Sequence, residues 1–185
     1  NEFWNVIEKW RFLTNNNSYD GLLKKYGNDY TKYKLSGNIE YLENNLERTL
    51  EEIRYNTPLR TSLVVHTDRV RTPGANTLKA MLTGDGTNEA SSPYHAITWE
   101  NTNRDFMALV DNFDSKTLSV QIFSHSNEKY NVRARVWLLD KGEYKLTLTN
   151  TKNEIISSKN INITKAGDRI TFTLPAEELV NLKVE

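Results

Sequence analysis

The apolar residues of this chain change their spacing near Thr57, from the period of a helix to the period of a strand. Spacings of three and four residues place side chains on one helix face, whereas spacings of two place them on one sheet face. Before Thr57 the helical spacing links Ile39, Leu42, Leu46, Leu50 and Ile53. After it apolar and polar residues alternate, and the apolar set includes Leu118, Val120, Ile122, Val132, Ala134, Val136 and Leu138. The sequence therefore predicts an α+β chain, with a short N-terminal helical segment (1–57) followed by an antiparallel, immunoglobulin-like β-sandwich (58–185).

Turn-forming residues divide both halves into short elements. We expect helices over residues 2–14, 19–26, 38–55 and, for one or two turns, 75–82. We expect strands near residues 94–100, 105–112, 117–125, 129–139, 142–150, 153–163, 168–174 and 179–184. Short strands closed by turn residues at this repeat length are typical of two packed antiparallel sheets. The expected core contains Val110, Ile122, Val136, Leu146, Ile170 and Leu182, and Trp137 is expected on an outer face beside Arg133 and Arg135.

Composition narrows the classes of function. The 185 residues include 24 basic and 24 acidic side chains, so the formal charge is zero, and no long basic run marks a nucleic-acid partner. No cysteine is present, which excludes disulfides and thiolate metal sites. The three histidines lack zinc-binding spacing, and no phosphate-binding loop occurs, so neither a metal nor a cofactor is expected. No apolar stretch approaches the ~20 residues of a membrane span. The chain starts at Asn1 without Met, which indicates a processed chain or a piece of a longer one.

Two polar clusters are candidates for chemistry. In the first, His66, Asp68 and Arg69 lie in an apolar stretch, where His can move a proton, Asp can orient it and Arg can hold a carboxylate. The simpler interpretation is an Asp–Arg bridge that anchors a strand end. The second cluster joins Tyr94 and His95, a pair suited to proton transfer at a sugar carbon.

Tryptophans offer a different kind of site. Trp99 next to Glu100 combines a surface for stacking on a sugar with a carboxylate for its hydroxyl groups, and Trp137 offers a second ring. Trp99 and Trp137 are therefore candidate substrate-binding residues. Aromatic residues in strands are more often part of a core, which is the alternative interpretation for both.

Several stretches together resemble the closing region of large bacterial polysaccharide-processing proteins. They include Gly37-Asn38-Ile39-Glu40-Tyr41-Leu42-Glu43, Pro58-Leu59, Thr67-Asp68-Arg69-Val70, Tyr94-His95-Ala96-Ile97-Thr98-Trp99-Glu100, Phe106-Met107-Ala108-Leu109-Val110, Val136-Trp137-Leu138 and Gly142-Glu143-Tyr144. The chain is similar here to polysaccharide lyases of the α/α-toroid class, in which a ring of helix pairs is followed by a β-sandwich. The resemblance covers the chain from about residue 37 onward. It implies that residues 1–57 are the last helices of a toroid.

This resemblance implies a secreted bacterial protein, extracellular or periplasmic, that acts on a polysaccharide or oligosaccharide. The sandwich would support or line a sugar cleft, beside an upstream domain of the same protein. The longer protein from which this chain would come, called the parent below, would be a polysaccharide lyase or a glycoside hydrolase. The chain would be inactive alone. Within the matching stretches, the polar residues that could take part in β-elimination are His66, Arg69, Tyr94 and His95. The alternatives are a non-catalytic carbohydrate-binding module, a protein-interaction module and a structural cap.

Overall fold

The computed structural model describes residues 2–56, 75–87, 94–102 and 106–185. It divides into two compact units. The helical unit contains the described residues of Asn1–Ala80 and Gly86–Ser92, and the sandwich unit contains those of Met81–Asp85 and Pro93–Glu185. The predicted domain boundary at residue 57 lies outside the described residues and stays a prediction.

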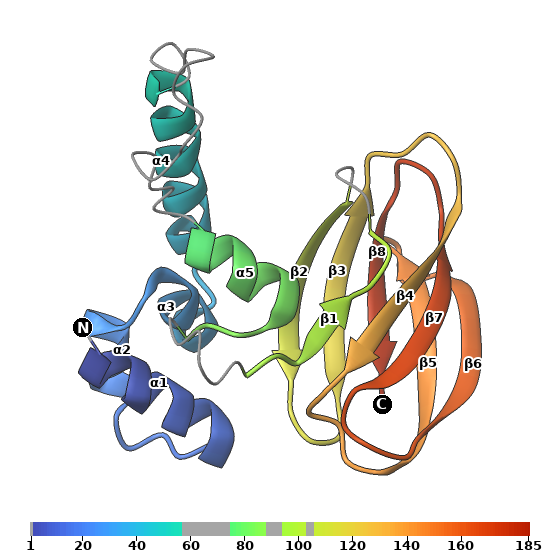
Figure 1. The fold of residues 1–185 in the computed structure, drawn as a ribbon, viewed down its shortest axis with the longest axis horizontal. Coiled ribbons are helices and arrows are strands. Elements are labelled where there is room, and N and C mark those ends of the chain that lie inside the picture. Colours follow the sequence, from blue (N-terminus) through green and yellow to red (C-terminus); the bar gives the residue numbers. More distant parts are fainter. Residues whose placement is uncertain (1, 57–74, 88–93, 103–105) are drawn as a thin grey trace, which may run out of the picture. The chain divides into compact units, whose positions relative to one another are not determined.

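The helical unit is built from consecutive short helices (Figure 1). These are α1 (Glu2–Thr14), α2 (Asp20–Tyr26), α3 (Asp29–Ser36) and α4 (Glu40–Asn56), and α5 (Ala75–Thr83) follows them in the chain. Helices that are neighbours in sequence pack together, α1 on α2, α2 on α3 and α3 on α4. None of the described helices is both long and apolar enough to cross a membrane.

Local capping explains where α3 and α4 begin. The side chain of Asn28 accepts a hydrogen bond from the backbone N–H of Thr31, which satisfies a free donor in the first turn of α3. Gly37 ends that helix in the left-handed conformation, at φ 72°. One residue later, the side chain of Asn38 accepts from the backbone N–H of Glu40 at 3.0 Å and caps α4.

A buried carboxyl group ties α1 to the start of α3. Glu8 is 1% exposed, and its two oxygens accept from the backbone N–H and the side-chain amide of Asn28, both at 2.7 Å. Burial disfavours the charged form and raises the pKa of Glu8 to about 7, although the bonds from Asn28 oppose that rise. The helical unit therefore contains an acid that titrates near neutral pH.

The sandwich unit consists of two antiparallel sheets. The three-stranded sheet has the order β1 (Ile97–Trp99), β4 (Tyr130–Val136), β7 (Asp168–Leu174). The five-stranded sheet has the order β2 (Phe106–Phe113), β3 (Leu118–Ser124), β8 (Leu179–Val184), β5 (Gly142–Asn150), β6 (Ile155–Ile163). The three-stranded sheet covers one face of the five-stranded sheet, and β6 and β7 run along the same side (Figure 1).

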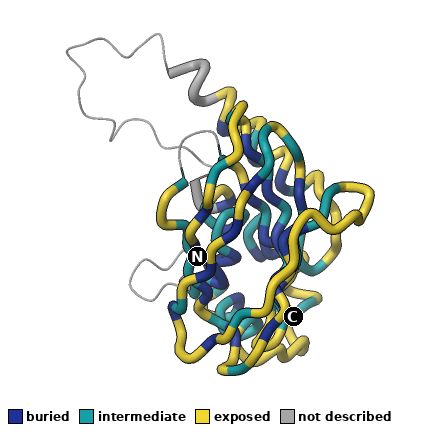
Figure 2. The backbone as a smooth tube through the Cα atoms, turned by 90° about the vertical axis from the view of Figure 1, so that its right-hand side faces the viewer, coloured by how far each residue is buried: buried dark blue, intermediate teal, exposed yellow. Residues whose placement is uncertain are grey.

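The core lies between the sheets and follows the alternation of the strands. In β4, Val132, Ala134 and Val136 are buried, whereas Arg133 is exposed and Arg135 is half-buried. Strands β3, β5, β7 and β8 alternate in the same way, and buried and exposed segments alternate along the backbone in Figure 2. Each fully buried Val, Leu or Ile contributes about 1.5–3 kcal/mol relative to its exposed state. The buried residues of both sheets include Val110, Ile122, Leu146, Ile170 and Leu182.

Strand β6 departs from this alternation. It forms the edge of the five-stranded sheet, pairs only with β5, and is exposed over Ile155–Asn160. Strand β7 forms the edge of the other sheet and pairs only with β4. Two edge strands therefore face the same opening of the sandwich, and the inner side of β6 is left partly uncovered.

The predicted α+β sandwich is confirmed, as are the six predicted core residues. The first predicted strand is shorter than expected, at Ile97–Trp99, because the chain before it hydrogen-bonds to Asp85 and Thr83 and only then joins β4. Helix α3 was not predicted. Its tyrosine-rich sequence shows no clear helical period, and the cap at Asn28 sets its start.

Candidate functional site

The solvent side of the three-stranded sheet, called the outer face below, carries a row of polar side chains. Strand pairing places Thr98 opposite Arg135, and Arg135 opposite Arg169. The next rungs pair Arg133 with Thr171, and Asn131 with Thr173. Because side chains of paired residues lie on the same side of a sheet, these groups form one polar surface.

A single carboxylate organises the centre of the outer face. Glu100 accepts from Arg135 Nε at 2.5 Å and from Arg169 Nε at 2.7 Å, and Arg169 Nη2 adds a further bond at 3.1 Å. The hydrogen bonds from Arg169 and Arg135 lower the pKa of Glu100 to about 2. Glu100 is therefore ionised at neutral pH, and the two guanidinium groups are held in fixed positions with net positive charge.

Trp137 extends the outer face just after β4. Its indole N–H donates to the hydroxyl of Thr98 at 2.8 Å. Its six-membered ring lies over Gly167, where an added Cβ would sit 2.9 Å from Trp137 Cζ3. The ring is thus fixed at two points and is still 40% exposed. Rigid, partly exposed aromatic rings with a polar handle suit stacking on an amphipathic ligand. The predicted position of Trp137 beside Arg133 and Arg135 is confirmed.

A hollow of about 540 Å³ lies further along the outer face, where Asn101 follows Glu100 in the chain and Arg133 precedes Arg135 on the same face of β4. Its polar groups include the guanidinium of Arg133, which makes no hydrogen bond or ion pair within the described part of the chain. Its lining consists of Asn101, Asn131, Arg133, Lys159, Thr171, Phe172 and Thr173. Asn101 fixes one wall by donating to the carbonyl of Asn131 and accepting from the N–H of Arg133. The hollow therefore has a firm frame and polar groups suited to hydroxyl ligands.

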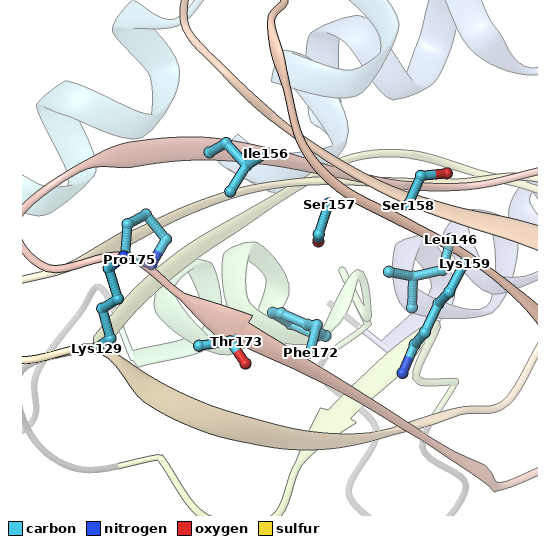
Figure 3. A pocket seen from close by; sticks show the side chains of 9 residues that line it. All are labelled: Lys129, Leu146, Ile156, Ser157, Ser158, Lys159, Phe172, Thr173 and Pro175. Atoms are coloured by element: carbon cyan, nitrogen blue, oxygen red, sulfur yellow. The ribbon is translucent and has the colours of Figure 1, made fainter.

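A second hollow, called the edge groove below, opens between β6 and β7 and holds about 350 Å³ (Figure 3). Leu146 and Phe172 supply apolar floor, and Lys159 lies at one end while Lys129 and Pro175 lie at the other. Its complete lining is Lys129, Leu146, Ile156, Ser157, Ser158, Lys159, Phe172, Thr173 and Pro175. Sequence reasoning missed this groove, because Ser157 and Lys159 look like ordinary surface residues of a strand.

Tyr94 and His95 lie together near a buried carboxylate. Asp85 Oδ2 accepts from the backbone N–H of Tyr94 at 3.1 Å and lies 3.6 Å from His95 Nε2. Burial raises the pKa of the Tyr94 hydroxyl. Asp85 can orient the imidazole, as a carboxylate partner does for a histidine that transfers protons. His66 and Arg69 lie outside the described residues, so their predicted part in this chemistry stays a prediction.

Trp99 occupies a more enclosed position than Trp137. Its indole N–H donates to the carbonyl of Leu82 at 2.7 Å. Its ring packs on Phe106, with centroids 4.8 Å apart, and edge-on against Phe172. This packing makes Trp99 a support of the sandwich interior, while Trp137 presents the open ring.

No protein-family model matches the chain, and no curated protein matches it. Among solved structures, a GH30 endoxylanase from Clostridium papyrosolvens C71 is 11% identical over 49% of this chain and 24% of that one, with a TM-score of 0.34. A glycoside hydrolase family 44 xyloglucanase from Paenibacillus polymyxa is 16% identical over 43% of this chain and 16% of that one, with a TM-score of 0.31.

A third chain, described as "CBM4 structure and function", is 11% identical over 48% of this chain and 66% of its own length, with a TM-score of 0.30. This protein thus spans at most about a quarter of the two enzymes. At these identities and TM-scores the likenesses are partial.

Proposed function

We propose that the sandwich unit binds carbohydrate on its outer face and belongs to the closing region of a larger, carbohydrate-active bacterial protein. The observation that carries this proposal is the exposed ring of Trp137, fixed by Thr98 and Gly167. Beside it stand the charged group of Glu100, Arg135 and Arg169 and the polar hollow. A flat apolar ring suits the apolar face of a sugar ring, and the flanking charged and amide groups suit its hydroxyls.

The helical unit fits the last helices of an α/α toroid of the polysaccharide-lyase class. Each of the helices α1 to α4 packs on its neighbour along the chain, which is compatible with the end of such a ring. Helix α1 also leaves a shallow apolar hollow open, lined by Phe3, Val6, Ile7, Trp10 and Tyr19. Apolar surface of this kind suits burial against an upstream helix of the same protein. The compartment would be extracellular or periplasmic.

In the parent protein we place sugar binding on the sandwich and the chemical reaction in the sugar cleft that the sandwich would line. If the reaction is β-elimination, a base removes the proton beside a uronate carboxylate and an acid protonates the leaving oxygen. Tyr94 and His95, oriented by Asp85, offer groups of the type that these two steps need. The alternative is that the full-length parent protein is a glycoside hydrolase, which cleaves the glycosidic bond with water. Incubation of the full-length parent with uronate polysaccharides should release products with unsaturated, ultraviolet-absorbing ends if it is a lyase.

Binding is tested by affinity electrophoresis of this chain against neutral and acidic polysaccharides. At least one polysaccharide should retard the chain. Trp137→Ala should weaken that binding by about tenfold, because ~60 Å² of apolar ring area at ~25 cal/mol per Å² corresponds to about 1.5 kcal/mol. Trp99→Phe, a change in the enclosed ring, is the matched control and should bind as the unaltered chain does. Absence of retardation by every polysaccharide would refute carbohydrate binding.

A protein-interaction module is the second candidate. It is favoured by β6, an edge strand with unpaired backbone groups on which Ile155 is 65% exposed and Ile156 is 41% exposed. Such edges can accept an added strand from another chain. Replacement of Ile155 by Lys should abolish binding of a protein partner and leave glycan binding at Trp137 unchanged.

A further inference from the structure

The hollow on the outer face and the edge groove form one channel around β7. Lys159, Phe172 and Thr173 line both of them, so a ligand can pass from one to the other without leaving the protein surface. Each part has a volume within the ~300–1,000 Å³ range of ordinary ligand sites. We call the two parts together the basic channel.

The charged residues of the basic channel all have the same sign. Lys129 and Lys159 line the edge groove, Arg133 and Lys159 line the hollow, and no described acidic side chain lines either part. This differs from the chain as a whole, which has 24 basic and 24 acidic residues. An electrically balanced protein therefore concentrates three cations along one depression, and that arrangement attracts anions.

Lys159 occupies a position where an apolar residue would be expected. It pairs with Leu146, which is buried, so both side chains lie on the inner side of the five-stranded sheet. Its ammonium group reaches out of the sandwich and donates to Thr171 of the opposite sheet at 3.2 Å. An inward-facing lysine at an open edge also discourages addition of another strand. The observations thus favour an anionic ligand over an added β-strand at this opening.

We propose that the basic channel binds an acidic polysaccharide, a glycan that carries carboxylate or sulfate groups. This inference rests on the proposed carbohydrate binding at Trp137 and specifies the ligand class. Lys129, Arg133 and Lys159 contact the anionic groups of successive sugars, and Thr173 and Ser157 offer hydroxyls to the sugar hydroxyls. Trp137 and the Glu100 group then hold the part of the glycan that crosses the outer face.

The test compares matched pairs of glycans that differ in charge. The carboxylate pair is polygalacturonate and its carboxyl-reduced form, and the sulfate pair is dextran sulfate and dextran. Affinities are measured by isothermal titration calorimetry on the full chain at two salt concentrations. One acidic member should bind at least about tenfold more tightly than its neutral partner, and that preference should fall with salt. The preferred pair identifies carboxylate or sulfate as the recognised group.

Variants assign the effect to the channel. Lys159→Gln and Arg133→Gln should each lower affinity for the acidic glycan by about two- to fivefold, and the double variant by about tenfold. Lys145→Gln removes the same charge from an exposed position on the other side of the five-stranded sheet and should change nothing. Binding of the neutral glycan, which depends on Trp137, should be unchanged in Lys145→Gln and should fall less than binding of the acidic glycan in the Lys159 and Arg133 variants.

Four results would overturn the proposal. Equal affinity for the charged and neutral glycans would refute it while leaving carbohydrate binding intact. Equal losses in the Lys159 and Lys145 variants would show that only net charge matters. Binding of polyglutamate as tight as that of the acidic glycan would identify the channel as a site for acidic peptides. Absence of any glycan binding would refute this proposal and the proposed function together.

Discussion

Arg135 and Arg169 lie opposite each other across the pairing of β4 and β7, and the carboxylate of Glu100 holds both. Two like charges on neighbouring strands repel each other unless a counter-charge is shared. Glu100 supplies that charge from a residue 35 positions before one arginine and 69 positions before the other. This contact fixes the centre of the outer face.

Glu100→Gln should lower the melting temperature of the chain by a few degrees at pH 7. The pKa of Glu100 is about 2 in the folded state, below its ordinary value of 4.5. A lowered carboxyl pKa stabilises the fold above pH 4.5, and that contribution is lost as the pH falls toward 2. The difference between the two proteins should therefore shrink below pH 4.5 and vanish near pH 2. Thermal unfolding followed across this range checks it, with the exposed Glu143→Gln as control; a difference that persists at pH 2 contradicts it.

The helical unit should lose stability as the pH rises through neutrality. The pKa of Glu8 is raised to about 7 by burial, so the folded state binds a proton that the unfolded state releases near pH 4.5. The stabilisation is full below pH 4.5 and disappears as the pH passes 7, and it amounts to about 3 kcal/mol at most. Urea unfolding followed by far-ultraviolet circular dichroism, which reports helices, should show this trend. Glu8→Gln should remove the trend. If the stability of this variant still falls as the pH rises, Glu8 is excluded as the source of the trend.

Gly167→Ala should destabilise the sandwich by about 1–3 kcal/mol and loosen Trp137. The backbone at Gly167 has φ +81°, and a Cβ there would sit 2.9 Å from Trp137 Cζ3. Chemical denaturation gives the stability, and acrylamide quenching gives the exposure of the ring. Gly21→Ala, within α2 and with nothing within 4 Å of the new Cβ, should be neutral or stabilising. Similar losses at both glycines would contradict this account.

The two sandwich tryptophans should respond differently to alanine. Trp99→Ala removes a ring packed against Phe106 and Phe172 and should cost about 3 kcal/mol of unfolding free energy. Trp137→Ala should cost less, about 1 kcal/mol, because the ring is 40% exposed. Urea unfolding of both variants measures these costs. Equal losses would mean that Trp137 is a core residue and not an open platform.

Local sequence patterns predicted most of the strands because the alternation of apolar residues is strong in β3, β4, β5 and β7. They did not predict α3, whose residues Asp29–Ser36 lack a clear period. They placed Trp137 on the correct face but left Trp99 and Trp137 equivalent as candidate platforms. The distinction comes from tertiary contacts, above all the bond from Trp99 to Leu82.

The candidate site on the outer face also depends on tertiary contacts that local sequence patterns do not predict. Glu100 meets Arg135 and Arg169 only because β1, β4 and β7 are neighbours in a sheet, and spacing along the chain does not encode that order. The edge groove arises where the five-stranded sheet extends past the three-stranded one. Lys159 lines a site because its strand, β6, lies at the edge of the larger sheet. In sequence, Lys159 is one lysine among many polar residues of an exposed strand.

The central claim is that the outer face of the three-stranded sheet binds carbohydrate. Its most direct measurement is a titration of the isotope-labelled chain with oligosaccharides, followed by amide and indole chemical shifts. The account predicts that the shifts cluster on the indole of Trp137 and on the amides of Arg133, Arg135 and Thr171. Shifts confined to the helical unit or to β2 and β3, or no shifts with any neutral or acidic oligosaccharide, would contradict it.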